Sequence, residues 1–243
     1  MQVPYEDPIT MLAVEKYMRA HQWDGYVNIG DFMDLDSISR FNENSPGEKE
    51  NKRLDQDYLE GNTILDRHQA IIRKRNRKAR FVYLEGNHEY RIEDYFKKHP
   101  ELKDGHYAVK NALRLEERGF EWIRSWSNNE PFSLGKANFV HGKYTNQYHP
   151  AKMANKYGDN IFYGHTHDMM CHAVAHEFHP DKVHVGQSIG CLCKPQKYMK
   201  GSLNNWQQGF MVLFLLPDGK FNYYLPRIFN HQFIGPDGVL YRP

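Results

Sequence analysis

The sequence predicts an α/β fold, and three observations indicate it. Short apolar strands alternate with amphipathic helices through the first 140 residues, strands end at glycines followed by polar side chains, and the second half is rich in further short strands. The chain of 243 residues contains no internal repeat, linker or low-complexity run. Because single α/β folds reach about 250 residues, we expect residues 1–243 to form one domain.

Hydrophobic periodicity predicts two helices and two strands in the first half. Thr10 is expected to cap the first helix, and Tyr58, Leu59, Leu65, Ile71 and Ile72 are the expected buried positions of the second. The expected elements, in order, are a helix at residues 10–21, a strand at 25–30, a polar surface excursion at 42–56, a helix that continues from it to residue 76, and a strand at 81–84.

The second half is predicted to consist mainly of strands. Pro217-Asp-Gly219 is a strong turn signal, so the two strands that flank it should form a hairpin. The expected strands are residues 138–141, 160–163, 182–185, 209–216 and 221–225.

Composition limits the class of protein. Charged residues make up 26% and hydrophobic residues 40% of the chain, which are ordinary globular values. A formal net charge of +2 excludes a uniformly cationic coat for nucleic acid but permits a local basic patch. No apolar run approaches the roughly 18 residues of a membrane span, and the start does not resemble a signal peptide. Three cysteines, an odd number, favour reduced thiols, so we expect a cytoplasmic location and no membrane partner.

Four short segments combine an apolar strand, a tight turn and potential metal ligands, and eight of the 14 histidines fall between His141 and His184. In open α/β sheets, ligands bind just outside the carboxyl ends of strands, so these segments should deliver their side chains to one rim. Carboxylate, amide and imidazole donors suit Mn, Fe or Zn rather than Ca, and no thiolate is expected among them. The segments are Gly30–Asp34, Gly86–Glu89, Val140–Gly142 and Gly164–His167.

In order and spacing, these motifs resemble the signature of the calcineurin-like metallophosphoesterase superfamily: GDxxD, GNH(E/D), a strand-end His and GHxH. The resemblance covers at least residues 24–167. It implies a four-layer α-β-β-α sandwich and two divalent ions, with Mn the first expectation and Fe, Zn, Ni or Mg as alternatives. The implied activity is hydrolysis of a phosphodiester or phosphomonoester by a hydroxide that bridges the two ions.

The resemblance also implies a role for each motif residue. Asp31 would bridge both ions, and His167 would bind the ion on one side. The ligands that would complete the shell of the other ion are Asn87, His141 and His165. His88 would lie beside the phosphate as electrophile or general acid, with Asp34 orienting its imidazole.

One family element, an N-terminal Asp-x-His that binds the same ion as His167, has no match before Gly30. Gln2 stands where that histidine would fall and could supply one weak amide ligand. Either the given chain lacks its first strand, or the protein has a depleted first metal site and binds only one ion firmly. The second case leaves open a catalytically weakened protein that keeps the fold for binding or as a scaffold.

Three weaker features remain, and the first two have two interpretations each. The basic run Arg73–Arg80 is either a solvated helix end or a phosphate-contacting patch for a nucleic acid or nucleotide substrate. Arg91 could meet a substrate phosphate or pair with Glu93 or Asp94. Cys191 and Cys193 are too close together for the usual zinc knuckle and have no second pair, so they are not expected to bind metal.

Overall fold

The computed structural model describes residues 1–39, 53–102, 105–195 and 204–243, and shows a mixed α/β fold with several sheets. Most of the predicted polar excursion at 42–56 therefore lies outside the described residues. Five α-helices occur in the described part of the chain. Among these residues, no helix is both long and apolar enough to cross a membrane.

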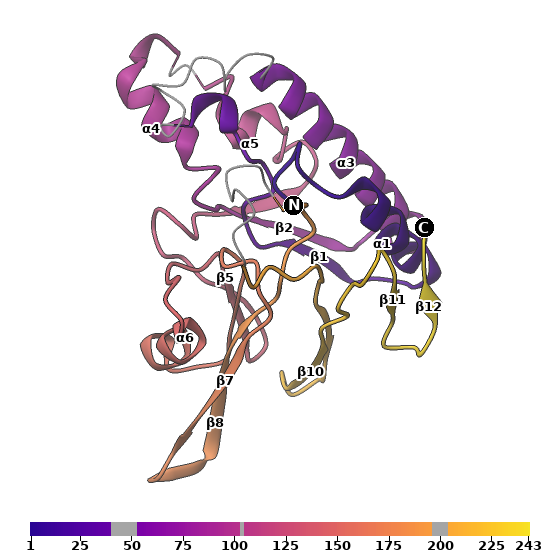
Figure 1. Cartoon of the computed structure of the whole chain (residues 1–243), viewed down its shortest axis with the longest axis vertical. Coiled ribbons are helices and arrows are strands. Elements are labelled where there is room, and N and C mark those ends of the chain that lie inside the picture. The colour runs from indigo at the N-terminus through magenta and orange to yellow at the C-terminus, as the bar shows by residue number, and fades with distance from the viewer. Residues whose placement is uncertain (40–52, 103–104, 196–203) are drawn as a thin grey trace.

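The N-terminal half forms a three-stranded parallel sheet with the order β1-β2-β3, and its helices lie on one side of that sheet (Figure 1). The two predicted helices and two predicted strands are all present. The elements are α1 (Pro8–Ala20), β1 (Gly25–Asn28), α3 (Leu54–Arg75), β2 (Arg80–Leu84), α4 (Arg91–Lys98), α5 (Val109–Ala112) and β3 (Phe120–Ile123), with short 3-10 turns at Asp36–Ile38 and Pro100–Leu102.

The prediction that Thr10 caps the first helix is wrong, because the cap is Asp7. Its Oδ1 accepts hydrogen bonds from the backbone N–H of Ile9 at 3.2 Å and of Thr10 at 3.3 Å. Pro8 occupies the first helical position, where a missing N–H costs nothing. The helix therefore begins two residues before the predicted start.

The second half forms a five-stranded mixed sheet with the order β4-β5-β6-β8-β7, followed by two small hairpins. Strands β5, β6 and β8 run parallel, while β4 and β7 are antiparallel edge strands. The hairpin predicted around Pro217–Gly219 is confirmed by the antiparallel β9–β10 pair. The elements are β4 (Phe132–Leu134), β5 (Ala137–Val140), α6 (His149–Tyr157), β6 (Ile161–Tyr163), β7 (Cys171–His176), β8 (His179–Ser188), β9 (Val212–Leu215), β10 (Phe221–Tyr224), β11 (Phe233–Ile234) and β12 (Leu240–Tyr241).

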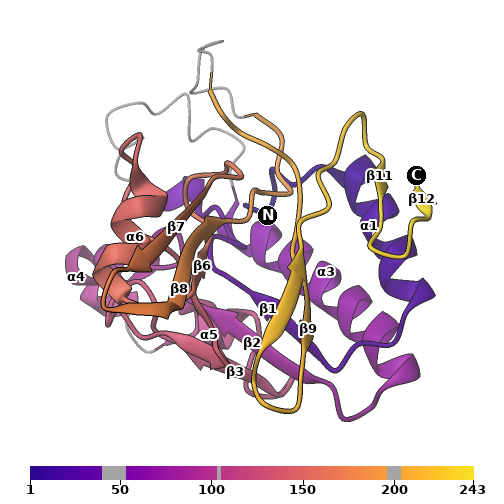
Figure 2. The same cartoon turned by 90° about the horizontal axis from the view of Figure 1, so that it is seen from below.

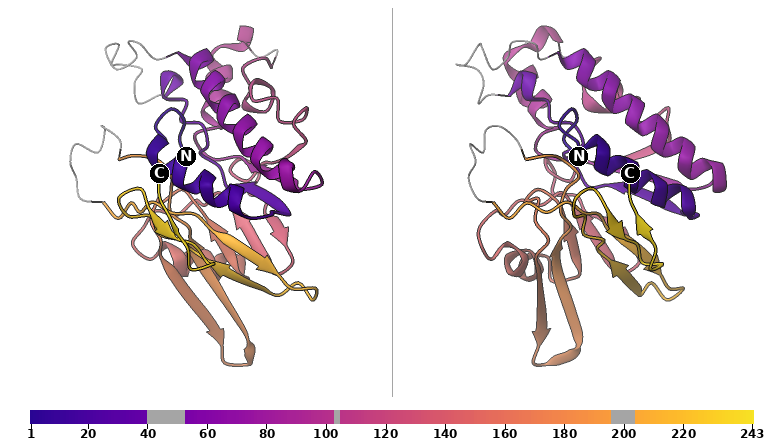
Figure 3. Two further views of the ribbon diagram at one scale, coloured as in Figure 1. Left: turned by 90° about the vertical axis from the view of Figure 1, so that its right-hand side faces the viewer. Right: turned by 45° about the vertical axis from the view of Figure 1, so that its right-hand side comes forward.

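The two sheets share one apolar core, as the alternation along β2 makes clear. Val82 and Leu84 pack with Phe139 and Phe162 of the second sheet. The alternate residues of β2, Phe81 and Tyr83, face the other way, toward α3. Helix α6 contacts β7 and β8. Figure 2 shows α1 and α3 on one side of β1 and β2, with β6, β7 and β8 on the other, and the long β7–β8 hairpin projects from the molecule in Figure 3.

The predicted buried face of α3 is nearly right. Tyr58, Leu65 and Ile72 are buried and Ile71 is half-buried, but Leu59 is 68% exposed, because the buried positions recur at helical spacing from Tyr58 and Leu59 falls outside that stripe.

The basic run Arg73–Arg80 lies at the end of α3 and the amino end of β2. Arg73 donates to the carbonyl of Arg118 at 2.7 Å, and Arg80 pairs with Glu121 at 2.6 Å. Because the metal-ligand motif of β2 follows its carboxyl end, the run is at the opposite end of this strand. The contacts favour the interpretation of a solvated helix end.

Candidate metal centre

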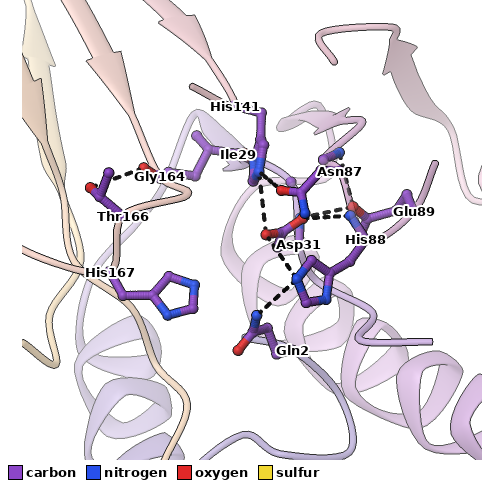
Figure 4. Close-up of polar contacts among 12 residues, drawn as sticks. Gln2, Ile29, Asp31, Asn87, His88, Glu89, His141, Gly164, Thr166 and His167 are labelled. Carbon is purple, nitrogen blue, oxygen red and sulfur yellow. Dashed lines mark hydrogen bonds and ion pairs between the residues drawn. The ribbon is translucent and has the colours of Figure 1, made fainter. Parts of the chain in front are cut away.

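Four predicted ligands meet at the carboxyl ends of β1, β2, β5 and β6. Ligand atoms of Asp31, His141 and His165 lie within 4.8 Å of one another, and Asp31 Oδ2 is 3.3 Å from His141 Nε2. Asn87 Oδ1 lies 2.9 Å from the same His141 nitrogen (Figure 4). The structure therefore brings together the four side chains assigned to the stronger metal position. We refer to them as the Asp31 set.

His88 lies beside this set and contacts Asp34, as the resemblance implied. His88 Nδ1 is 3.3 Å from Asp34 Oδ2 and 3.1 Å from the Asp34 carbonyl oxygen. Its other nitrogen, Nε2, is 3.8 Å from Asp31 Oδ2 and 3.4 Å from the amide nitrogen of Gln2. Gln2 is buried, and its backbone N–H donates to the Asp31 carbonyl at 2.8 Å, so Gln2 lines the site next to His88.

Arg91 also belongs to this site, through a partner that the sequence did not indicate. Its guanidinium donates to Asp34 Oδ1 at 3.1 Å, rather than pairing with Glu93 or Asp94 as one interpretation expected. Its Nη2 lies 3.1 Å from His88 Nε2. Because a guanidinium can only donate, this contact makes Nε2 of a neutral His88 an acceptor and places the ring proton on Nδ1, toward Asp34.

Charge and burial compete at these groups. Burial opposes the ionisation of Asp31, but the neighbouring His141 and His88 hold its pKa well below the usual value. Burial is the largest single influence on His88 and His141 and lowers their pKa, but the net pKa of each is raised. Asp31 acts together with Asp34 at His88, and together with the Ile29 carbonyl and Glu89 at His141. Burial, reinforced by His141, lowers the pKa of His165 to about 4. His165 therefore enters the site as a neutral imidazole, the form that binds metal.

Unusual backbone conformations accompany these ligands. Asp31, His165 and His167 have φ values of 51°, 67° and 61°, and Gln2 has a φ of 59°. Left-handed φ is uncommon for residues other than glycine and persists only where the surroundings enforce it. Such strain at four residues of one rim is typical of a functional site rather than of ordinary turns.

Glu89 enforces the turn at Asp31. This buried carboxylate accepts hydrogen bonds from the backbone N–H of Asp31 at 2.8 Å and of Gly86 at 2.9 Å on one oxygen. The other oxygen accepts from the N–H of Phe32 and Met33 and from the hydroxyl of Tyr83, at 2.8, 3.0 and 2.8 Å. Sequence reasoning included Glu89 only as the fourth letter of a motif and did not find this role.

The ligands open onto a cavity of about 320 Å³. One wall is held by Asp168, whose Oδ1 accepts from the Thr166 and Ser188 hydroxyls at 2.8 and 2.6 Å, and whose Oδ2 is 3.0 Å from His149 Nε2. Sequence reasoning did not find Asp168, although it directly follows the Gly-His-Thr-His motif. The lining residues are Gln2, Asp31, His88, Thr145, His149, His165, Thr166, His167, Asp168 and Trp206.

His167 differs from the other predicted ligands in its neighbours. It approaches from the opposite side of the site, with its ring pointing toward Gln2 (Figure 4). Its Nδ1 lies 4.0 Å from Sγ of Cys193, and the ligand atoms of His167, Cys191 and Cys193 lie within 4.8 Å of one another. No thiolate was expected among the metal ligands, yet both buried cysteines lie beside His167 at this rim. A hydrogen bond with Cys193 lowers the pKa of the Cys191 thiol, and the same contact, with burial, raises that of Cys193.

Two phage proteins are similar to this chain over most of its length. The Gene 54 protein of Mycobacterium phage D29 is 28% identical over 222 residues, which cover 87% of this chain and 85% of the phage protein. The Gene 54 protein of Mycobacterium phage L5 is 27% identical over 230 residues, with the same two shares. No family model matches the chain, and no solved structure does. The names of the relatives state no activity, so the case for function depends on the site.

Proposed function

We propose that this protein is a metal-dependent phosphoesterase that hydrolyses a phosphodiester or a phosphomonoester. The observation that carries the proposal is the convergence of the Asp31 set beside the His88–Asp34 pair. A carboxylate, an amide oxygen and two imidazoles form a mixed oxygen and nitrogen set that suits a divalent transition-metal ion such as Mn²⁺, and the enforced left-handed turns support a site built for one. Bound divalent ions would supply an activated water and charge stabilisation for the phosphoryl group.

The chain's own residues would do the rest of the chemistry. Asp34 restrains the His88 ring through Nδ1 and favours its protonated form, in which Nε2 would carry the proton that passes to the leaving oxygen. Arg91 holds Asp34 in place and adds positive charge beside His88. The cavity of about 320 Å³ provides room for a small phosphoester group at these residues.

The finer features implied by the resemblance belong to the same proposal. Helices on one face of the first sheet, a core shared by two sheets, and α6 against the second sheet support a four-layer sandwich. Two bound ions are proposed, one held by the Asp31 set and one served by His167. A nucleotide-sized substrate suits the cavity better than a long nucleic acid, because the basic run contacts other elements. The three free cysteines support a reducing, cytoplasm-like compartment.

A second candidate function is a binding or scaffold protein with weakened catalysis. It is favoured by Gln2, which lines the cavity at the place where the resemblance expects a histidine ligand. Such a protein would bind one ion or none and would have no use for an oriented His88.

Metal content and turnover separate these candidates. The protein is loaded with Mn²⁺, freed of excess ion, and assayed with a bis-aryl phosphodiester and an aryl monophosphate. We expect turnover of one substrate, a loss of about 10²–10⁴-fold in His88→Ala with metal content retained, and loss of metal in Asp31→Asn. Asparagine tolerates the left-handed backbone of Asp31, so this variant tests the charge.

His172→Ala, an exposed histidine on the β7–β8 hairpin, is the matched control and should retain full activity. Turnover that survives His88→Ala would contradict its role as acid. Bound metal without turnover of either substrate would favour the scaffold.

A further inference from the structure

A second group of metal-binding side chains lies on the same rim and contains both buried cysteines. His167, Cys191 and Cys193 are all buried, and Cys193 is only 1% exposed. His167 Nδ1 faces Cys193 Sγ at 4.0 Å. His167 is not part of the compact Asp31 group, although it lies only two residues from His165 in that group. His165 and His167 of one loop thus belong to two different groups of potential metal ligands.

Strand order explains why these residues meet. β6 and β8 are parallel neighbours, with Tyr163 opposite Ser188 at their carboxyl ends. His167 follows the first strand and the two cysteines follow the second, so both segments leave the sheet at the same edge. The two loops are joined by a hydrogen bond from the Gly190 N–H to the Asp168 carbonyl at 2.8 Å.

The positions of His167 and Cys191 are also fixed by their surroundings. The ring of Trp206 packs against the His167 ring with centroids 4.1 Å apart. The N–H of Gln207 donates to the His167 carbonyl at 2.8 Å, and the N–H of Cys191 donates to the Gln207 carbonyl at 3.0 Å. Ligands held in this way are preorganised, which is what a metal site requires of its scaffold.

From this geometry we propose that His167, Cys191 and Cys193 form a site for a thiophilic divalent cation, with Zn²⁺ as the expected ion. Two sulfurs and one imidazole nitrogen are the Cys₂His set that binds tetrahedral zinc and leaves a fourth position open. Tetrahedral zinc would place sulfur and nitrogen about 3.6 Å apart, so the observed 4.0 Å requires only a small contraction on binding. Binding displaces the thiol protons, because thiolates are the ligands.

The site changes the chemistry of the rim. The Asp31 set offers oxygen and imidazole, whereas this group offers sulfur and imidazole, so the two should prefer different ions. The proposed function assigns His167 to one of two ions. If the zinc ion is that ion, this inference rests on the proposed function. The two cysteines would then supply ligands at the metal position that the Asp-x-His motif serves in the family that the chain resembles.

The test uses Co²⁺ as a spectroscopic substitute for zinc in the reduced, metal-free full chain. Thiolate ligation gives a near-ultraviolet charge-transfer band and intense visible bands of tetrahedral cobalt. We expect these bands in the wild type and their loss in Cys193→Ser and Cys191→Ser. Zn²⁺ affinity, measured by competition with a chelating dye, should fall by at least about 10–100-fold, the loss seen even for supporting residues of metal sites.

Two controls make the result specific. Cys171→Ser removes the exposed cysteine and should leave the cobalt bands unchanged. Asp31→Asn should lose manganese at the Asp31 set but keep the cobalt bands, because these arise from the two thiolates and Asp31 is not among the three clustered donors. Circular dichroism of each serine variant shows whether it is folded.

The outcomes also separate this inference from the proposed function. Absence of the bands in the wild type, or bands that persist in a folded Cys193→Ser variant, would overturn the thiolate site. A Cys191–Cys193 disulfide that forms in preference to metal binding, seen by mass spectrometry, would also overturn it. Cobalt bands without phosphoester turnover would refute the proposed phosphoesterase activity but support the thiolate site. Turnover without the cobalt bands would support the phosphoesterase activity and refute the thiolate site.

Discussion

The hydrogen bonds of Glu89 allow a quantitative prediction for Glu89→Gln. The substitution keeps the size of the side chain but replaces one carboxylate oxygen with an NH₂ group. If the remaining oxygen keeps the bonds from Phe32, Met33 and Tyr83, the NH₂ group faces the N–H donors of Asp31 and Gly86, which lose their acceptor.

Hydrogen bonds to charged groups contribute about 1.5–3 kcal/mol each, so losing two should cost about 3–6 kcal/mol. That cost is a large fraction of the 5–15 kcal/mol by which typical domains are stable. Because the lost bonds hold the turn at Asp31, Mn²⁺ affinity should fall as well.

Urea unfolding, followed by circular dichroism, measures the free energy of unfolding. Tyr83→Phe removes a single donor to Glu89 and should cost about 1.5–3 kcal/mol. Glu117→Gln, at an exposed carboxylate, is the matched control and should stay within about 0.5 kcal/mol of the wild type. If Glu89→Gln proved no more harmful than Glu117→Gln, the role of Glu89 in holding the ligand turn would be refuted.

Two further predictions concern Glu6 and Gly86. Burial, with a contribution from Glu60, raises the pKa of Glu6 from 4.5 to about 7, so the native state retains a proton that the unfolded state releases. This contribution to stability is present below about pH 4.5 and is lost as the pH rises through about 7. In Glu6→Gln, the free energy of urea unfolding should therefore fall less between these two pH values. If it fell as steeply with pH as in the wild type, the assignment to Glu6 would be disproved. In Gly86→Ala, the new Cβ would meet Asp31 and lie 2.7 Å from Glu89 Oε2, so metal content should fall and stability drop by about 1–3 kcal/mol. Gly25→Ala, whose nearest neighbour would be 3.4 Å away, should keep its metal, and equal metal retention by both variants would count against the close packing.

Local sequence carried most of the prediction of the Asp31 set. Each ligand directly follows an apolar strand, and parallel strands bring their carboxyl ends together whatever the intervening loops contain. The same reasoning placed His88 at this rim, whereas its pairing with Asp34 was implied by the family resemblance; the two side chains meet at 3.3 Å. The positions of β1, β2, β5 and β6 were also predictable, because apolar runs that stop at a turn have few alternatives. In contrast, β3, β4 and β7 were not predicted, and β8 extends beyond the expected residues 182–185.

Contacts between distant segments could not be predicted in this way. The meeting of Cys193 with His167 depends on β8 lying beside β6, an order that no local pattern encodes. Likewise, Arg91 has acidic neighbours along the chain but pairs with Asp34, because the turn after β1 carries that carboxylate to it. Spacing rules for zinc motifs excluded the cysteines because they consider one segment at a time.

The division of ligands between the two sheets has a mechanical consequence. Asp31 and Asn87 follow strands of the first sheet, whereas His141, His165 and the thiolate group follow strands of the second. In the described part of the chain, His141 forms hydrogen bonds to Ser125 and to the Ile29 carbonyl across the two sheets. Most other contacts between the sheets are apolar, and such contacts are not directional and would tolerate small sliding movements. A bound ion accepts only a narrow range of ligand distances, so it would fix the register of one sheet against the other at the rim. The side chains that bind the ion would thereby also set the shape of the cavity in which a phosphoester would react.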